Sequence, residues 1–306
     1  MQRFLAHIFF LIVLIGASFD LKAQPGNALT REAIELCNSG DLINAKLTIL
    51  EALRDEESAV DPETWYVKGY IYKEIFKNID KESRLSDNRE IAVDAILRSI
   101  ELDHDRVWKE YNKKAIKYLA ISFYNHSIDV SSSLNKENHA EAIALFSRFE
   151  QLFPLYSEVG DLSALKLDFY GSMATGFRKI YEQDRDRNLI YLQEALIYYE
   201  RMIEIKPAHY GANYNAGICH YNQAAYRASK INYETEIFEL IVIQDECLKS
   251  FKKALPYILK SDELEPDRVN GLKALMAIYR SMNDQEKSDY YFNRMQDLIK
   301  KGEIRN

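Results

Sequence analysis

Small and large side chains recur along this chain at spacings typical of packed helices. A small residue precedes a large apolar one by four positions at Ala45/Ile49, Ala92/Ile96, Ala142/Phe146, Ala195/Tyr199, Ala254/Ile258 and Ser288/Phe292. That spacing places both members on one face of an α-helix. A proline follows the large residue by eight positions in three cases, at Pro154, Pro207 and Pro266. Because proline cannot continue a helix but suits the first turn of the next one, the pattern predicts pairs of helices joined by sharp stops.

A second series lies upstream of each pair and has the same helical spacing. It consists of an apolar residue, a small one four positions later and usually an aromatic one three positions after that: Leu29/Ala33/Leu36, Trp65/Gly69/Tyr72, Ile116/Ala120/Phe123, Tyr170/Ala174/Phe177, Asn213/Gly217/His220 and Leu272/Met276/Tyr279. Two antiparallel helices cross closely only where neither carries a bulky side chain. We therefore expect the small residues of the two series, Met276 being the exception, to mark the crossings of six helical hairpins.

These predicted hairpins resemble the tetratricopeptide repeat, a 34-residue helix–turn–helix unit with a W-x2-L-G-x2-Y start, a later A-x3-F and a closing proline. The second unit matches best, at Trp65, Gly69, Tyr72, Ala92, Ile96 and His104. Lys68 stands where the family has Leu. The final unit keeps the 34-residue register, and residues 254–300 are similar to the last repeats of exported tetratricopeptide repeat proteins of Bacteroidetes. Other solenoid families and a non-repetitive helical domain are the alternatives.

The resemblance implies an all-α fold, a right-handed α-solenoid of about six hairpins that fills residues 24–306. The units cover roughly residues 26–61, 62–106, 113–154, 167–207, 210–266 and 269–302. Relative to the family's spacing, units two to five carry about 11, 10, 9 and 25 extra residues. The sequence leaves open whether these residues lengthen the helices or form loops, for example at 80–89 and 131–138. The largest excess contains an apolar run, 237–243, which we expect to be buried within the monomer; a dimer contact is the alternative.

Residues 1–23 carry the pattern of a secretory signal peptide. Arg3 provides a positive start, and an apolar stretch covers residues 8–17. Asp20 and Lys22 end this stretch well before the roughly 20 residues that a membrane-spanning helix needs. We therefore predict a signal peptide; an uncleaved amphipathic anchor or a buried helix is the alternative.

Cleavage is expected after Ala23, with Ala17 as the second choice. The first cysteine is Cys37, too far from the apolar stretch to be lipidated. We expect the mature chain to be exported, either periplasmic or secreted, with no integral membrane span after cleavage. The formal net charge of the full chain, −7, disfavours partners that are polyanions, so neither nucleic acid nor an anionic membrane surface is expected.

The composition supports a helical core and excludes a disulfide scaffold. Eleven Gly and six Pro are too few for an all-β fold with many turns, and 47% of the residues are hydrophobic. Three cysteines allow one bridge at most. Cys219 and Cys247 fall on the two arms of one hairpin, but helix axes pack 8–10 Å apart, whereas a bridge needs Cα atoms within about 7 Å. Buried free thiols are the favoured interpretation, and a bridge is the alternative.

In the tetratricopeptide family the first helix of each hairpin lines a concave groove. Transferring that arrangement residue by residue predicts a groove lined by Tyr66, Tyr70, Lys73, Lys114, Lys117, Tyr124, Asn125, Arg178, Lys179, Tyr214, Tyr221, Asn222, Lys273 and Arg280, with Thr175 on the same face. Seven of these fourteen residues are basic and five are tyrosines, which suit an interface with a negatively charged or C-terminal peptide segment. The alternative is that they solvate an open surface or pair with Glu63, Glu74 and Asp168.

The sequence contains no recognisable catalytic or cofactor motif. Its histidines are scattered, with no two at the i, i+4 spacing of a zinc-binding helix, and there is no G-x-S-x-G, Walker or G-x-G-x-x-G motif. The family's carboxylate clamp needs an Asn one turn after Lys117, where this chain has Ile121. We expect no catalytic, metal or cofactor site. The favoured function is a non-enzymatic protein- or peptide-binding scaffold in an envelope assembly, and the alternative is a glycan-binding protein on the same scaffold.

Overall fold

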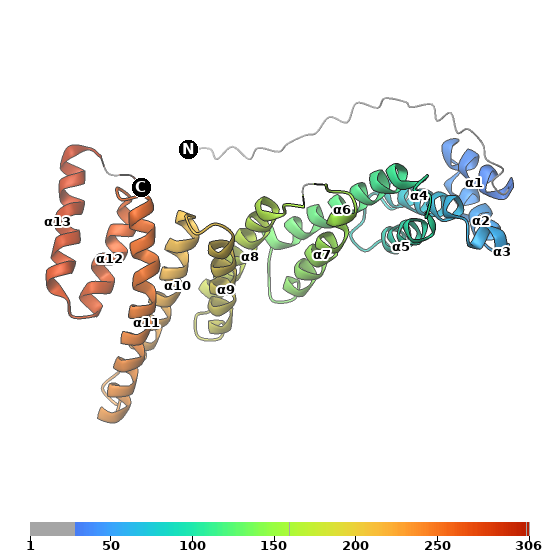
Figure 1. Ribbon diagram of the computed structural model, residues 1–306. Helices are drawn as coiled ribbons and strands as arrows, with labels where there is room; N and C mark the ends of the chain where they lie inside the picture. The colour runs from blue at the N-terminus through green and yellow to red at the C-terminus, as the bar shows by residue number, and fades with distance from the viewer. Residues whose placement is uncertain (1–27, 159, 304, 306) are drawn as a thin grey trace. The chain divides into compact units, whose positions relative to one another are not determined.

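A computed structural model describes residues 28–158, 160–303 and 305 of the chain (Figure 1). The predicted signal peptide, 1–23, lies outside the described residues. The helices are α1 (Ala28–Asn38), α2 (Leu42–Ala52), α3 (Glu56–Ala59), α4 (Pro62–Asn78), α5 (Asp87–Leu102), α6 (Lys109–Ser132), α7 (His139–Leu152), the short 3-10 helix η1 (Phe153–Leu155), α8 (Ser163–Gln183), α9 (Leu189–Ile205), α10 (Tyr210–Ala228), α11 (Ile237–Leu264), α12 (Val269–Ser281) and α13 (Gln285–Lys301). Within these residues the backbone forms no strand, only an isolated bridge between Arg268 and Arg305. The all-α prediction is therefore confirmed.

The chain divides into two compact units, each built from helical hairpins. The first contains the described residues up to 81 together with 87–109, and the second contains 82–86 together with 110 onwards. In the first unit α1 pairs with α2 and α4 with α5. Thr30 of α1 and Thr64 of α4, which lie 34 positions apart, join their hydroxyls at 2.9 Å. The first helices of successive hairpins are therefore neighbours, at the repeat length of the family.

Aspartates set the helix starts in the first unit. Asp41, Asp55 and Asp61 each accept a hydrogen bond from a backbone N–H in the first turn of α2, α3 and α4. Such caps satisfy donors that the helix itself leaves unpaired. Pro62 follows Asp61 at the first helical position, where its missing N–H costs nothing. The local sequence thus determines where each hairpin turns.

The second unit contains four hairpins, α6–α7, α8–α9, α10–α11 and α12–α13. Aromatic rings link α6, α7 and α8: Phe146 of α7 stacks on Phe169 of α8 at 4.0 Å between centroids, and Tyr124 of α6 packs on Phe149 at 5.1 Å. Further along, α9 packs on α10 and α11 on α12. The described chain is therefore consistent with an all-α helical repeat.

The close crossings lie where the small residues are. A Cβ atom added to Gly69 would lie 2.6 Å from Cδ1 of Ile96 and 3.1 Å from the carbonyl oxygen of Ala92. At Gly217 the corresponding distances are 2.5 Å to Ile258 and 3.1 Å to Ala254. Two separate hairpins therefore use the same contact at the same repeat position. The small members of the downstream series, Ala45, Ala92, Ala142, Ala195, Ala254 and Ser288, are all buried.

Among the large members of that series, Phe292 differs from the five others, which are buried. Its side chain remains 44% exposed. It lies on α13, the last helix of the described chain, where no described helix packs over it. The sequence pattern identifies a repeat position, but it does not show whether another helix packs over that position.

The extra residues of the middle units mainly lengthen helices. α6 has 24 residues, α8 has 21 and α11 has 28. The connecting segments are short, such as 133–138 between α6 and α7 and 229–236 between α10 and α11. Of the two alternatives left open for 131–138, the structure has both in part: Ser131 and Ser132 extend α6, and 133–138 connect it to α7. No helix among the described residues is both long and apolar enough to cross a membrane.

The expected burial of residues 237–243 is wrong for four of the apolar residues, whereas Leu240 and Ile243 are half-buried. Ile237 is 74% exposed, Phe238 81%, Ile241 55% and Val242 57%. In Figure 1 this end of α11 extends past the ends of α12 and α13. The α10–α11 hairpin is longer than the helices on either side, so no neighbouring helix covers its tip.

The three cysteines are buried free thiols, as favoured from the sequence. Cys247 donates a hydrogen bond from Sγ to the carbonyl oxygen of Ala224, 3.3 Å away. Burial raises the pKa of Cys37 and of Cys219 to about 12. Because only the thiolate reacts, both groups remain protonated and unreactive near neutral pH.

We expect no labelling by a small thiol reagent in the folded protein at pH 8. After denaturation without reductant, all three thiols should react, as counted by mass spectrometry. Only one reactive thiol under denaturing conditions would reveal a Cys219–Cys247 bridge, and rapid labelling of Cys37 or Cys219 in the folded protein would contradict their burial.

Candidate functional site

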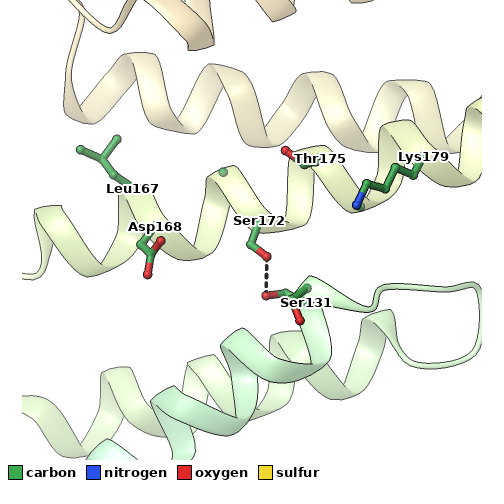
Figure 2. Close-up of a pocket in the computed structure, with 9 residues that line it drawn as sticks. Ser131, Leu167, Asp168, Ser172, Thr175 and Lys179 are labelled. Carbon is green, nitrogen blue, oxygen red and sulfur yellow. Dashed lines mark hydrogen bonds between the residues drawn. The ribbon is translucent and has the colours of Figure 1, made fainter. Parts of the chain in front are cut away.

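An open polar cleft of about 420 Å³ lies between α6 and α8 in the second unit. It is lined by Ser131, Ser132, Leu167, Asp168, Gly171, Ser172, Thr175, Gly176 and Lys179 (Figure 2). Both helices are first helices of their hairpins, the type that lines the groove in the tetratricopeptide family. The volume falls within the range of sites that hold a small molecule or a few side chains of a partner.

Two side-chain hydrogen bonds hold α6 and α8 side by side. The Tyr124 hydroxyl donates to Oδ2 of Asp168 at 2.7 Å, and the hydroxyls of Ser131 and Ser172 are joined at 2.8 Å. Figure 2 shows the serine pair bridging the helices, with Asp168 and Lys179 to either side of it along α8. Polar side chains therefore join α6 and α8 beside the cleft.

A glycine permits the close packing at one end of the cleft. A Cβ on Gly176 would lie 2.6 Å from Cβ of Leu134, which is in the turn after α6. Any larger side chain there would displace this turn. Gly176 thus places the end of α6 close to α8 without a side chain between them.

The two charged residues of the cleft differ in their surroundings. Asp168 accepts the Tyr124 hydrogen bond, and burial together with this carboxylate raises the pKa of Tyr124, so its proton remains in the bond. Lys179 is exposed and has no hydrogen-bond or ion-pair partner among the described residues. The cleft therefore ends in an ammonium group that is free to meet an anion.

Two more lysines of the predicted groove resemble Lys179 in being exposed and in lacking an acceptor among the described residues. Lys114 and Lys117 on α6 are exposed and have no acceptor within the described part of the chain. Lys117 precedes Tyr124 by seven positions and Ser131 by fourteen, which places the three on one face of α6. One polar face thus carries Lys117 at one end and Lys179 at the other.

The predicted groove residues of the first unit already have partners in the fold. Tyr66 stacks on Trp108 at 5.1 Å between centroids, and Lys73 pairs with Glu74 while lying 4.4 Å from the Tyr70 ring centre. Burial raises the pKa of Tyr70 to about 12, so its hydroxyl stays neutral. For Lys73, the alternative of internal pairing describes the structure better than a free cation does.

The remaining predicted residues divide between packed and exposed positions. Nη1 of Arg178 on α8 donates to Oδ1 of Asn215 on α10 at 3.0 Å, and the Tyr221 ring packs on Phe251 at 5.5 Å. Half-buried positions are occupied by Tyr214 and Asn222, and exposed ones by Asn125, Lys273 and Arg280. None of the fourteen is buried, but only Lys179, with Thr175 beside it, lines the cleft. Their use as a binding surface stays a prediction.

Sequence reasoning missed the serines that build the cleft. Ser131, Ser132 and Ser172 belong to no motif, and 131–133 was considered part of a loop. A run of serines at a predicted helix end would have been the signal. No group of His, Cys, Asp or Glu in the described residues has the arrangement of a metal site.

No family model matches this chain, and no curated protein matches it. Among solved structures it is similar to PilF of Pseudomonas aeruginosa, at 9% identity and a TM-score of 0.32 over 89% of this chain and 90% of that one. It is also similar to human IFIT1, solved as a dimer with m7Gppp-AAAA, at 14% identity and a TM-score of 0.32 over 87% of this chain and 58% of that one. Similarity at this level transfers no residue roles, so the function is argued from this chain's own side chains.

Proposed function

We propose that this chain is a non-enzymatic scaffold that binds an acidic segment of a protein partner along α6 and α8. The observation that carries this proposal is the unpaired ammonium of Lys179 at the end of the polar cleft. An exposed cation without an internal partner keeps its full charge for a ligand, whereas Lys73 is already neutralised by Glu74.

The length of the polar face determines the length of the segment. Fourteen positions separate Lys117 from Ser131 along α6, and a further seven separate Ser172 from Lys179 on α8. With a rise of about 1.5 Å per residue, the path from Lys117 to Lys179 measures roughly 30 Å. An extended peptide covers that distance in about nine residues. The proposal therefore requires carboxylates near both ends of such a segment and hydrogen-bonding groups between them.

The proposal places the protein outside the cytoplasm, on the strength of the signal-peptide pattern in residues 1–23. The negative net charge supports a protein partner over a nucleic acid, since the basic face is local and the chain as a whole repels polyanions. Glycan binding in the cleft is the second candidate, because the cleft volume suits a small ligand.

The test is binding of a labelled ten-residue peptide with glutamates at both ends and serines between, measured by fluorescence anisotropy. The double variant Lys117→Glu/Lys179→Glu should weaken binding about tenfold, since two exposed attractions become repulsions. The matched control is Lys252→Glu/Lys253→Glu on α11, a second helix, which changes the net charge equally. It should stay within twofold of the wild type.

Equal weakening by both double variants would mean that only the overall charge matters, and the proposal would fail. Equal affinity for an all-serine peptide would contradict it as well. Binding of a neutral oligosaccharide that Thr175→Phe abolishes would support the glycan candidate instead.

A further inference from the structure

The exposed tip of the α10–α11 hairpin carries a second surface that the proposed function does not use. We define it as the α11 tip: Ile237, Phe238, Ile241 and Val242. These residues form two i, i+4 pairs on one face of the first two turns of α11. Ile243 and Cys247, on the other side of the helix, pack in the apolar cluster formed with α10. The helix is thus apolar on both faces at this end, although only one face has a partner within the chain.

The area exposed is large for a protein surface. With a scale of about 200 Å² for one large side chain, the four residues leave roughly 500 Å² of apolar surface in water. Contiguous apolar patches of this size on soluble proteins usually mark binding sites. Single exposed apolar residues such as Leu85 need no such explanation.

The charged residues beside the α11 tip indicate the kind of partner that would bind there. Glu234, Glu236 and Glu239 surround the start of α11, and their carboxylates meet no basic side chain within the described part of the chain. The helix dipole explains a carboxylate in the first turn but not the apolar face next to it. Two copies joined through this face would bring six carboxylates together, and an anionic membrane would repel them.

We propose that the α11 tip binds a basic amphipathic helix of a partner protein. The apolar stripe of that helix would lie against Phe238 and Ile241, and its lysines or arginines would meet the three glutamates. In contacts of this kind, apolar side chains spaced three and four positions apart on the bound helix provide the affinity. Opposite charges at the edge of the contact determine the orientation of the helix and the choice of partner.

The probe is a labelled sixteen-residue peptide of leucine and lysine with helical periodicity, titrated with the purified protein in a fluorescence anisotropy assay. Two comparison peptides are needed: one of identical composition in strict alternation, and one with glutamate in place of lysine. The wild type should bind the helical leucine–lysine peptide at least tenfold more tightly than either.

Two sets of variants assign the binding to the tip. Phe238→Ser/Ile241→Ser and, separately, Glu236→Lys/Glu239→Lys should each weaken binding at least tenfold. The apolar control Leu85→Ser and the charge control Glu137→Lys/Glu204→Lys should remain within twofold of the wild type. All of these positions are exposed, so the substitutions should leave the fold intact, which circular dichroism verifies.

Three results overturn the proposal. They are equal binding of all three peptides, equal affinity in the tip and control variants, and a dimer in light scattering that Phe238→Ser converts to a monomer. The last result would assign the tip to a second copy of this chain. None of these outcomes depends on Lys117 or Lys179, so the acidic-peptide proposal and this one fail separately.

Discussion

Replacing Phe146 with alanine should cost about 3–5 kcal/mol of unfolding free energy in the second unit, as expected for a buried aromatic side chain. Phe146 is 2% exposed and its ring stacks nearly parallel on Phe169, with Tyr124 at 6.3 Å between centroids. It is therefore the ring through which α7 contacts both α6 and α8. Deleting it leaves a cavity beneath the helices that carry the polar cleft.

The matched control for this change lies at the same repeat position of the last hairpin. Phe292→Ala removes the same atoms from a side chain that is 44% exposed, and it should cost clearly less, about 1–2 kcal/mol. Urea unfolding followed by circular dichroism gives both values from the shift in midpoint. Similar costs for the two variants would show that Phe146 is not packed as described.

The second large effect is expected where a helix crossing depends on the absence of a side chain. Gly→Ala inside a helix normally stabilises by about 1 kcal/mol. At Gly69 and Gly217 the sign should reverse, with a net loss of about 1–3 kcal/mol, because the new methyl group would overlap a fully buried isoleucine and press on a backbone carbonyl.

Gly171 provides the comparison, since it lies in the middle of α8 with Met202 Cε, 3.5 Å away, as the nearest atom to an added Cβ. Gly171→Ala should stabilise the protein by about 0.5–1 kcal/mol. Thermal or urea unfolding of the three single variants tests the opposite signs directly. Stabilisation by Gly217→Ala would mean that α10 and α11 are further apart than the structure has them.

The sequence predicted the hairpins well because their main contacts are between helices adjacent in the chain. Gly69 meets Ala92 and Ile96, and Gly217 meets Ala254 and Ile258, at equivalent positions of two repeats. A helical period of 3.6 converts such spacings directly into faces, so the pattern indicates which face of each helix prefers burial. Buried free cysteines were expected on a different ground, because packed helix axes lie farther apart than a disulfide allows.

Prediction of the candidate site from sequence was only partial. Lys179 was singled out because it occupies a groove position of the family, but Ser131 and Ser172 were not. Their contact joins first helices of different hairpins, across 41 residues of chain. Neither serine belongs to a periodic apolar pattern, so no local signal indicates that they meet.

By itself the sequence determined that this protein is an array of helical hairpins with crossings at small residues, since those features depend on spacing within short segments. Only the tertiary structure decided which polar groups face each other between α6 and α8, which lysines remain unpaired, and that the tip of α11 is in water. These depend on the relative lengths of helices and on the presence or absence of a neighbour. A pattern of apolar residues records that a face prefers burial, but not whether another helix extends far enough to bury it.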